Sequence, residues 1–377
     1  MTFLHWVVDD KFIDVLISIM EHTKGKHSHI YAIVTDHTSD NFTYIQQKEY
    51  IRIIPSKDLI RVLTDCEVLV LHGLRIGVFD MLQQIPQRIK VIWSSWGYDL
   101  YSIPTKGHPF IKLPLYKPFT KRVMRKGVKE HLMGLHVEMN YFFNKKKIES
   151  AISRIDYFSS VIPQEYDLMR RLPFFKAQQV GLHYFSLDDI VSEENLGDPL
   201  PKENNILIGN SGDPTNNHLD VFESLRNIDI GNCKIYVPLS YGGTIAYREK
   251  VKTVGKEYWG ENFVALEKFV PYQEYNEIIS SCGNIILFHE RQQAMGNIRL
   301  GVWNGCKVFL SISGLTYQFH KNLGIRVFAL QNELNAEELK TPLSAAEVNL
   351  NRRRMLDTIS RKHLLNYIYH MYEILER

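Results

Sequence analysis

Residues 205–218 read NILIGNSGDPTNNH, and this stretch indicates the fold. The apolar run 206–209 is typical of a buried strand, and the small, turn-forming residues 209–214 follow it directly. A helix is expected to open from Thr215. A strand that ends in glycine and serine before a helix exposes several backbone N–H groups at one place, and such a place attracts a phosphate. An ordinary strand-to-helix turn is the alternative.

The composition limits the classes of protein that need to be considered. A chain of 377 residues suits two α/β domains better than one core. Apolar residues make up 45% and charged residues 23%, as in soluble globular proteins, and the net charge of +3 argues against a nucleic-acid binder. The four cysteines form no CxxC pair, which argues against a zinc site and fits a reducing compartment. We expect neither a signal peptide nor a transmembrane segment.

Short apolar runs alternate with helical patterns, which predicts parallel sheets covered by helices. Strands are expected at 3–8, 30–34, 68–71, 91–93, 156–159, 206–209, 234–237, 284–288, 308–311 and 327–330. Helices are expected at 11–21, 57–64, 75–84, 164–171, 215–226, 272–281 and 297–305. The polar segment 186–205 is the best candidate for a linker between two domains. We therefore expect an N-terminal domain over 1–190, a C-terminal domain over 200–345, and a C-terminal helix over 346–377 that could cross back to the first domain.

A second loop of the C-terminal domain, FHERQQAMGN at 288–297, also joins a predicted strand to a predicted helix. Asn297 is expected as the N-cap of this helix, and Gly296 would allow a ligand to approach the backbone closely. A solvated loop with a routine cap is the alternative. Because both loops belong to the same domain, we favour a shared binding site.

The polar side chains of this second loop suit a nucleotide-sugar. Arg291 could hold a phosphate through two parallel N–H bonds. Gln292 and Gln293 could bond a sugar hydroxyl or a base edge, and Glu290 could accept a bond from a ribose hydroxyl. Tyr241, beside a glycine turn at another strand end, could stack on a base or a sugar.

Two polar side chains at strand ends of the N-terminal domain are candidate bases. Asp99 lies in the aromatic segment WSSWGYDLY at 93–101, which suits sugar recognition, and it could act as a general base toward an acceptor hydroxyl. His72 ends the strand 68–71 and is the second candidate. The structural alternatives are aromatic packing with Asp99 as an N-cap, and a histidine that only supports the strand end.

Residues 106–147 form a basic and aromatic stretch. Its cations are Lys106, Lys112, Lys117, Lys121, Arg122, Arg125, Lys126, Lys129 and Lys145 to Lys147. Such a stretch suits an anionic membrane surface or a pyrophosphate-linked lipid. Binding to RNA is a competing explanation, but no RNA-binding motif accompanies the charges. A solvated helical face is the third possibility.

Four segments of the chain together resemble glycosyltransferase family 56: ILIGNSGDPTNNH at 206–218, VPLSYGG at 237–243, RQQAMG at 291–296 and WSSWGYDLY at 93–101. Known members of this family transfer Fuc4NAc from a TDP-sugar to a lipid-linked disaccharide. The resemblance implies the α/β GT-B architecture, with two Rossmann-like domains and a cleft between them. It places the donor in the C-terminal domain and the acceptor in the N-terminal domain.

The resemblance also implies a site that needs no metal and no cofactor, and a peripheral protein on the cytoplasmic face of the bacterial inner membrane. The residues that would bind the nucleotide diphosphate are Gly209, Asn210, Ser211, Gly212, Asp213, Arg291, Gln292, Gln293 and Gly296.

We therefore expect transfer of an N-acetylated amino-dideoxyhexose from a TDP- or UDP-sugar to an undecaprenyl-pyrophosphate-linked saccharide. One alternative is a non-catalytic nucleotide-sugar or lipid-surface binding protein of the same fold. A nicotinamide-dependent oxidoreductase is another, weakened because no GxGxxG follows the first strand.

Overall fold

The computed structural model describes residues 1–10, 12–36, 42–75, 77–101, 111, 113–124, 128–183, 185–191 and 203–377, without the side chains of 128–138, 140 and 141. The chain forms two units. Unit 1 comprises Met1–Lys112, Met133–Ser186 and Arg361–Arg377, and unit 2 comprises Leu113–Leu132 and Leu187–Ser360.

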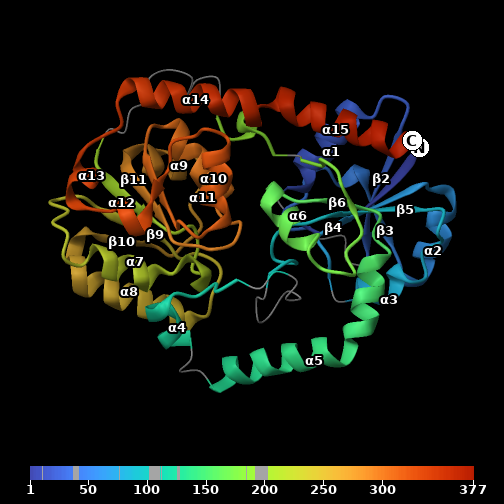
Figure 1. Cartoon of the computed structure of the whole chain (residues 1–377), viewed down its shortest axis with the longest axis horizontal. Coiled ribbons are helices and arrows are strands. Elements are labelled where there is room, and N and C mark those ends of the chain that lie inside the picture. Colours follow the sequence, from blue (N-terminus) through green and yellow to red (C-terminus); the bar gives the residue numbers. More distant parts are fainter. Residues whose placement is uncertain are drawn as a thin grey trace. The chain divides into compact units, whose positions relative to one another are not determined.

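Unit 1 is built on a seven-stranded sheet in the order β3-β2-β1-β4-β5-β6-β7, in which every pair is parallel (Figure 1). Its strands are β1 (Thr2–Val7), β2 (Ser28–Val34), β3 (Ile51–Ile54), β4 (Val68–His72), β5 (Lys90–Ser94), β6 (Tyr157–Ser159) and β7 (Gln178–Gln179). Its helices are α1 (Ile13–Thr23), α2 (Leu59–Val62), α3 (Val78–Leu82), α6 (Pro163–Met169), α15 (Arg361–Glu376) and the greater part of α5 (Val128–Ser153).

The core of unit 1 lies between the central strands and the helices α1 and α15. Phe3 and Val7 of β1 pack there with Leu16 of α1 and Ile368 of α15, and all four are fully buried. Burial of this apolar stripe explains why the last helix of the chain is stable in unit 1.

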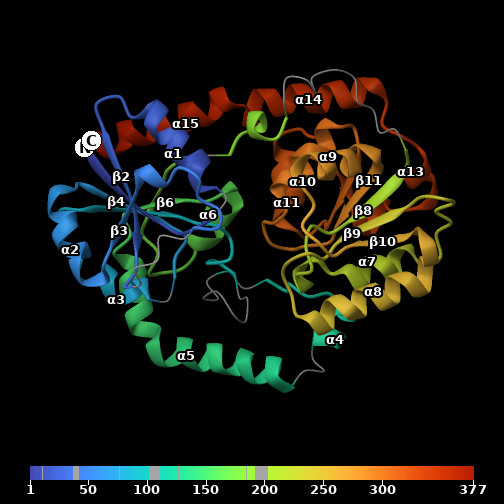
Figure 2. The same ribbon diagram turned by 180° about the vertical axis from the view of Figure 1, so that it is seen from behind.

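Unit 2 is built on a six-stranded parallel sheet in the order β10-β9-β8-β11-β12-β13. Its strands are β8 (Asn205–Ile208), β9 (Ile235–Pro238), β10 (Phe263–Leu266), β11 (Cys282–Leu287), β12 (Lys307–Leu310) and β13 (Phe328–Ala329). Its helices are α4 (Pro118–Met124), α7 (His218–Leu225), α8 (Ile245–Trp259), α9 (Tyr272–Ser281), α10 (Met295–Trp303), α11 (Leu315–Asn322), α12 (Leu330–Glu333), α13 (Ala336–Lys340) and α14 (Ala345–Ile359). Helices α7 and α8 cover one face of this sheet, and α9 and α10 cover the other (Figures 1 and 2).

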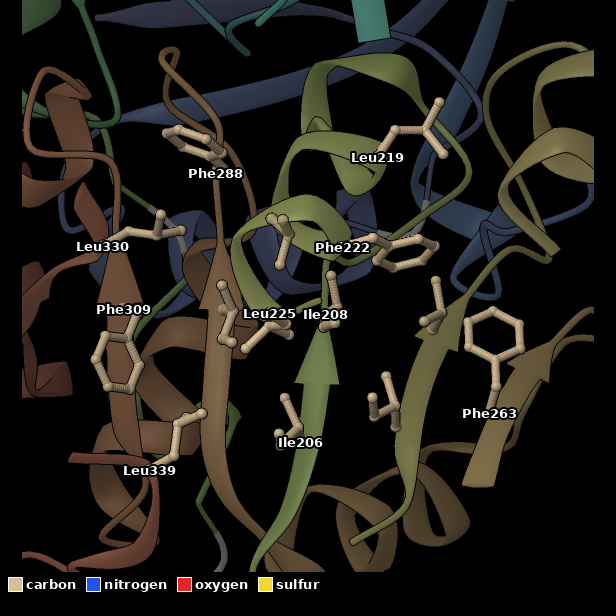
Figure 3. Packing of buried hydrophobic residues seen from close by; sticks show 14 of the residues in the cluster. Ile206, Ile208, Leu219, Phe222, Leu225, Phe263, Phe288, Phe309, Leu330 and Leu339 are labelled. Atoms are coloured by element: carbon tan, nitrogen blue, oxygen red, sulfur yellow. The ribbon is translucent and has the colours of Figure 1, made fainter. Parts of the chain in front are cut away.

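Alternate residues of the central strand β8 serve the two faces of the second sheet. Ile206 and Ile208 point toward α7, where they meet Phe222 and Leu225 (Figure 3). All residues of β8 are buried, because helices cover both sides of the strand. This is the physical reason for the unbroken apolar run in the sequence.

The doubly wound α/β fold expected from the sequence is confirmed, with several local differences. The short strands β3, β7 and β10 were not expected, and they lie at or beside sheet edges. The helix expected at 215–226 begins only at His218, and the region 346–377 forms two helices because Ser360 adopts an extended conformation.

The observed units also differ from the expected domain boundaries. Leu113–Leu132 belongs to unit 2, and so does α14, whereas α15 belongs to unit 1. Parts of the proposed linker (192–202) and of the basic stretch (106–110, 112 and 125–127) lie outside the described residues. Among the residues that the structure describes, no helix combines the length and the apolar character that crossing a membrane requires.

Candidate functional site

The second sheet has a topological switch point between β8 and β11, because the strand order proceeds outward in opposite directions from this pair. In doubly wound sheets, ligands bind beside the carboxyl ends of the two strands at such a point. The loop 209–217 follows β8, and the loop 288–294 follows β11. Both loops singled out in the sequence therefore lie at the position where this fold binds ligands. We call 209–217 and 288–294 the switch-point loops.

Hydrogen bonds join these two loops directly. Nε2 of Gln293 donates to Oδ1 of Asn210 at 2.8 Å, and the hydroxyl of Thr215 lies 2.8 Å from Oε1 of Gln293. An Nη of Arg291 lies 3.5 Å from the same hydroxyl. Gln292 is half-buried, and its carbonyl accepts from Arg291 at 3.4 Å. The structure thus brings Asn210, Arg291 and Gln293 together.

Several N–H groups of the loop 209–214, which were expected to be exposed, have acceptors within the protein. Gly209 N–H donates to Ile286, Asn210 N–H to the Asn216 side chain, and Gly212 N–H to the carbonyl of Tyr241. The N–H of Asp213 donates to Oγ of Ser211, and the Asp213 carboxylate caps the N–H of Thr215 at 2.9 Å. These N–H groups already have acceptors within the protein, so they are not open donors of the kind that was expected.

Asn217 is the reason why the helix after β8 starts late. It adopts a left-handed conformation with φ of 53°, and a 3-10 turn (Pro214–Asn216) precedes it. Its side-chain amide donates to the carbonyls of Leu115 and Phe288 at 3.0 and 2.7 Å. Long-range contacts therefore fix this conformation, which a β-branched or bulky residue would adopt only with strain.

The loop after β9 approaches the loop after β8 through glycine. Gly243 has a φ of +63°, and a Cβ there would lie 2.1 Å from the carbonyl oxygen of Gly212. Only glycine fits so close a backbone contact. Beside it, Tyr241 is 54% exposed, and its hydroxyl lies 3.4 Å from Nδ2 of Asn210. An exposed aromatic face thus borders the joined loops, where it could stack on a base or a sugar.

The first turn of α10 offers N–H groups of the kind that were expected in the loop 209–214. This helix begins at Met295, after Ala294 in a left-handed conformation, and its first internal bond runs from Ile298 N–H to Ala294. The N–H groups at the start of a helix have no acceptor within it and attract anions. A Cβ at Gly296 would meet no atom within 4 Å, so open space lies beside this turn. Asn297 is not the N-cap, because Ala294 holds that position and Asn297 lies in the first turn, where its amide donates to the hydroxyl of Tyr275 at 2.8 Å.

Glu290 is buried and has partners that the sequence did not reveal. Its Oε1 accepts from the hydroxyls of Ser311 and Ser313 at 2.6 and 3.0 Å. Nζ of Lys117 lies 2.6 Å from the same oxygen. Lys117 comes from the stretch that was expected to face a membrane. No local pattern could have placed it here, because its partner is far away in the sequence.

His72 occupies the switch point of the first sheet, between β1 and β4, but it is 1% exposed. Its Nε2 lies 3.0 Å from Nδ1 of His5, whose Nε2 lies 2.9 Å from Nδ1 of His29. Nε2 of His29 lies 3.1 Å from the hydroxyl of Tyr372 on α15. Burial lowers the pKa of His72 to about 3. A buried imidazole with so low a pKa does not support the expected role of a base.

Asp99 is also buried, and its carboxylate supports the loop in which it lies. Oδ2 accepts from the N–H of Leu74 at 2.8 Å and from the indole of Trp93 at 2.7 Å, and Oδ1 accepts from the N–H of Trp96 at 3.0 Å. Burial raises the pKa of Asp99, while these bonds oppose the rise. The arrangement favours a structural role over the expected general base.

Comparisons with known proteins agree with this architecture. Residues 189–350 match the family described as 4-alpha-L-fucosyltransferase glycosyl transferase group 56. An alpha-glucosyltransferase solved with UDP and a DNA containing a HMU base is 9% identical over 100% of both chains, with a TM-score of 0.56. The lipopolysaccharide outer core galactosyltransferase WaaB is 9% identical over 99% of each chain, with a TM-score of 0.58.

A third solved structure, an alpha,alpha-trehalose-phosphate synthase from Burkholderia xenovorans, is 9% identical over 100% of this chain and 99% of that chain, with a TM-score of 0.61. At these identities the likeness concerns the fold alone. The chain therefore has the GT-B fold, and its residues 189–350 match the model of glycosyl transferase group 56, in agreement with the sequence resemblance.

Proposed function

We propose that the protein transfers an N-acetylated amino-dideoxyhexose such as Fuc4NAc from a TDP- or UDP-sugar to an undecaprenyl-pyrophosphate-linked saccharide. The matched family is described by the transfer of fucose, which like Fuc4NAc is a 6-deoxy sugar. The observation that carries the proposal is the pair of hydrogen bonds by which Gln293 joins the two switch-point loops.

In this proposal the donor diphosphate binds at the first turn of α10, beside the guanidinium of Arg291. When the bond between the sugar and the diphosphate breaks, negative charge develops on the leaving phosphate oxygen. Fixed N–H donors and a cation at that position stabilise this charge, which is commonly the largest contribution to catalysis. Helix N–H groups and Arg291 serve this purpose without a divalent metal. Tyr241 supplies the aromatic face for the base or the sugar.

The proposed acceptor is a lipid, and α5 offers a surface for its membrane. Phe142 and Phe143 are 74% and 75% exposed on this helix, and Lys145, Lys146 and Lys147 follow them. Exposed aromatic rings beside cations suit an anionic bilayer surface. We propose a peripheral protein on the cytoplasmic face of the bacterial inner membrane.

Calorimetry with TDP, UDP, GDP and NADH tests the donor site, in EDTA and again with added magnesium. We expect TDP or UDP to bind in EDTA, and Arg291→Ala to weaken this binding at least tenfold. Arg353→Ala, an exposed position on α14, is the matched control. Binding of NADH alone, or of no nucleotide, contradicts the proposal. Donor binding without sugar transfer to a lipid-linked acceptor would instead indicate a non-catalytic binding protein.

A further inference from the structure

The segment 113–124 is fixed within unit 2 by side chains of the turn after β8 and of the first turn of α7. Asn217 accepts from the N–H of Lys117 at 2.8 Å through Oδ1, and its Nδ2 donates to the carbonyl of Leu115 at 3.0 Å. Asp220 accepts from the N–H groups of Phe119 and Thr120, both at 2.9 Å, and so caps the start of α4. These four bonds fix the position of the segment along the switch-point loop.

The side chain of Lys117 is held at the carboxyl end of β11. Its Nζ lies 2.6 Å from Oε1 of Glu290 and 4.9 Å from the ring centroid of Phe288. The Glu290 side chain is 2% exposed, whereas 19% of the Lys117 side chain remains exposed. An ammonium has three N–H donors, and Glu290 requires one of them. The pair therefore presents an oriented cation at the edge of the switch point.

The preceding residue, Tyr116, places the same segment close to both switch-point loops. Burial raises the pKa of Tyr116 to about 12, with a smaller contribution from Asp213, whereas Arg291 lowers it. Asp213 belongs to the loop after β8 and Arg291 to the loop after β11. Tyr116 thus lies within electrostatic range of both, and Lys117 lies beside the second loop.

We propose that Lys117 is a second cation of the nucleotide-diphosphate site, and that Glu290 positions its ammonium. This inference rests on the proposed donor site. The carboxylates of Asp213 and Glu290 lie in the same region and carry one negative charge more than the guanidinium of Arg291 offsets. Lys117 offsets this remaining negative charge, which would otherwise repel a diphosphate, and its held position lowers the entropic cost of binding.

The experiment must separate binding of phosphate from simple support of Glu290, because a buried carboxylate without its partner is costly. Lys117→Met, Glu290→Gln and the double variant are therefore compared with Lys250→Met, an exposed lysine of α8. For each protein, calorimetry gives the affinity for TDP, TMP, UDP and UMP, and urea unfolding gives the stability.

If Lys117 contacts the second phosphate, the double variant regains wild-type stability but binds the diphosphate about 10- to 100-fold more weakly, with monophosphate affinity nearly unchanged. Wild-type diphosphate affinity in the double variant would overturn the inference and leave Lys117 a structural partner of Glu290. Equal loss for diphosphate and monophosphate would overturn it too. Failure of the unaltered protein to bind any of these nucleotides would instead refute the donor site itself.

Discussion

Gln293 and Asn210 connect the carboxyl ends of β11 and β8, with 2.8 Å between Nε2 of the first and Oδ1 of the second. Gln293 is 7% exposed, and its other amide atom accepts from Thr215. Because a planar amide fixes donor and acceptor on opposite edges, one side chain holds two points of the facing loop. The arrangement fixes the geometry on which the proposed donor site depends.

Gln293→Leu should separate the two loops, because leucine has a similar size but no polar atoms. The side-chain oxygen of Asn210 would lose its donor, whereas the hydroxyl of Thr215 keeps the Asp213 carboxylate as an acceptor. The expected cost is about 1–3 kcal/mol in the free energy of unfolding. The affinity for the nucleotide diphosphate should also fall, because the two loops that form the proposed site are no longer joined. Urea unfolding and calorimetry measure the two effects. Gln318→Leu, at an exposed position of α11, should change neither, and wild-type affinity in Gln293→Leu would contradict this account.

The sequence predicted the elements whose local pattern and tertiary environment agree. Strands such as β8 and β11 are buried on both faces, so their apolar runs are continuous and easily recognised. The edge strands β3 and β10 are short and half-buried, and four residues such as IRII carry too little periodicity to be recognised. Both switch-point loops were likewise predicted, because turn-forming residues follow an apolar strand pattern in the sequence.

Long-range contacts decided the features that the sequence did not predict. Asn217 interrupts the helix after β8 because its side chain binds Leu115 and Phe288, and nothing in its neighbours signals this. Lys117 was one cation among many, and only the folded chain pairs it with Glu290. His72 and Asp99 were chosen for their chemistry, whereas burial, which local sequence does not reveal, opposes their expected role.

Gly296→Ala should separate ligand binding from stability at the start of α10. A Cβ at this position meets no protein atom within 4 Å, and alanine favours a helix over glycine by up to about 1 kcal/mol. We expect equal or higher thermal stability together with weaker binding of the diphosphate, because the added methyl group occupies the space beside the N–H groups.

Gly301 of the same helix provides the contrast to Gly296. A Cβ there would lie 2.3 Å from Cδ1 of Ile285, so Gly301→Ala should destabilise the protein by about 1–3 kcal/mol. Calorimetry and thermal unfolding of both variants test the distinction. Unchanged diphosphate affinity in Gly296→Ala would show that no ligand approaches this turn.

Asp99→Asn should lower stability, because an amide cannot accept all three hydrogen bonds of the carboxylate. The loss should be about 2–3 kcal/mol in the free energy of unfolding, as for hydrogen bonds to a charged group. Asp167→Asn, at a half-exposed carboxylate of α6, serves as the control. If Asp99→Asn instead keeps its stability and loses only kcat, Asp99 acts as the general base after all.

The double variant Phe142→Ser, Phe143→Ser should bind anionic vesicles at least tenfold more weakly. Burying a phenylalanine side chain contributes about 1.5–3 kcal/mol, and both rings are exposed in the structure. Co-sedimentation with vesicles that contain phosphatidylglycerol measures the affinity, and raising the salt concentration should weaken it further. Phe269→Ser, at a phenylalanine that is 85% exposed in unit 2, should bind like the unaltered protein. Equal binding by the double variant would exclude this surface of α5.

The line of histidines in unit 1 should make the protein unstable in acid. Burial lowers the pKa of His72 to about 3 and that of His29 to about 4, and it lowers the pKa of His5 as well, whereas an unfolded chain has its histidine pKa near 6.5. Above pH 6.5 neither state takes up a proton, so these histidines add no pH dependence to the free energy of unfolding. Below pH 6.5 only the unfolded state is protonated at these histidines. The free energy of unfolding therefore decreases as the pH is lowered, until the native histidines also begin to take up protons near pH 4.

Each of these histidines should contribute up to about 1.4 kcal/mol per pH unit across this window. Urea unfolding at several pH values between 7.5 and 5 gives the slope, and the slope gives the number of protons taken up on unfolding. His29→Gln should reduce that number by about one, because glutamine does not titrate. His370→Gln, at a 63% exposed side chain, serves as the control. A stability that stays constant between pH 7 and pH 5 would mean that the histidine line is already protonated, or opens to solvent, in the native protein.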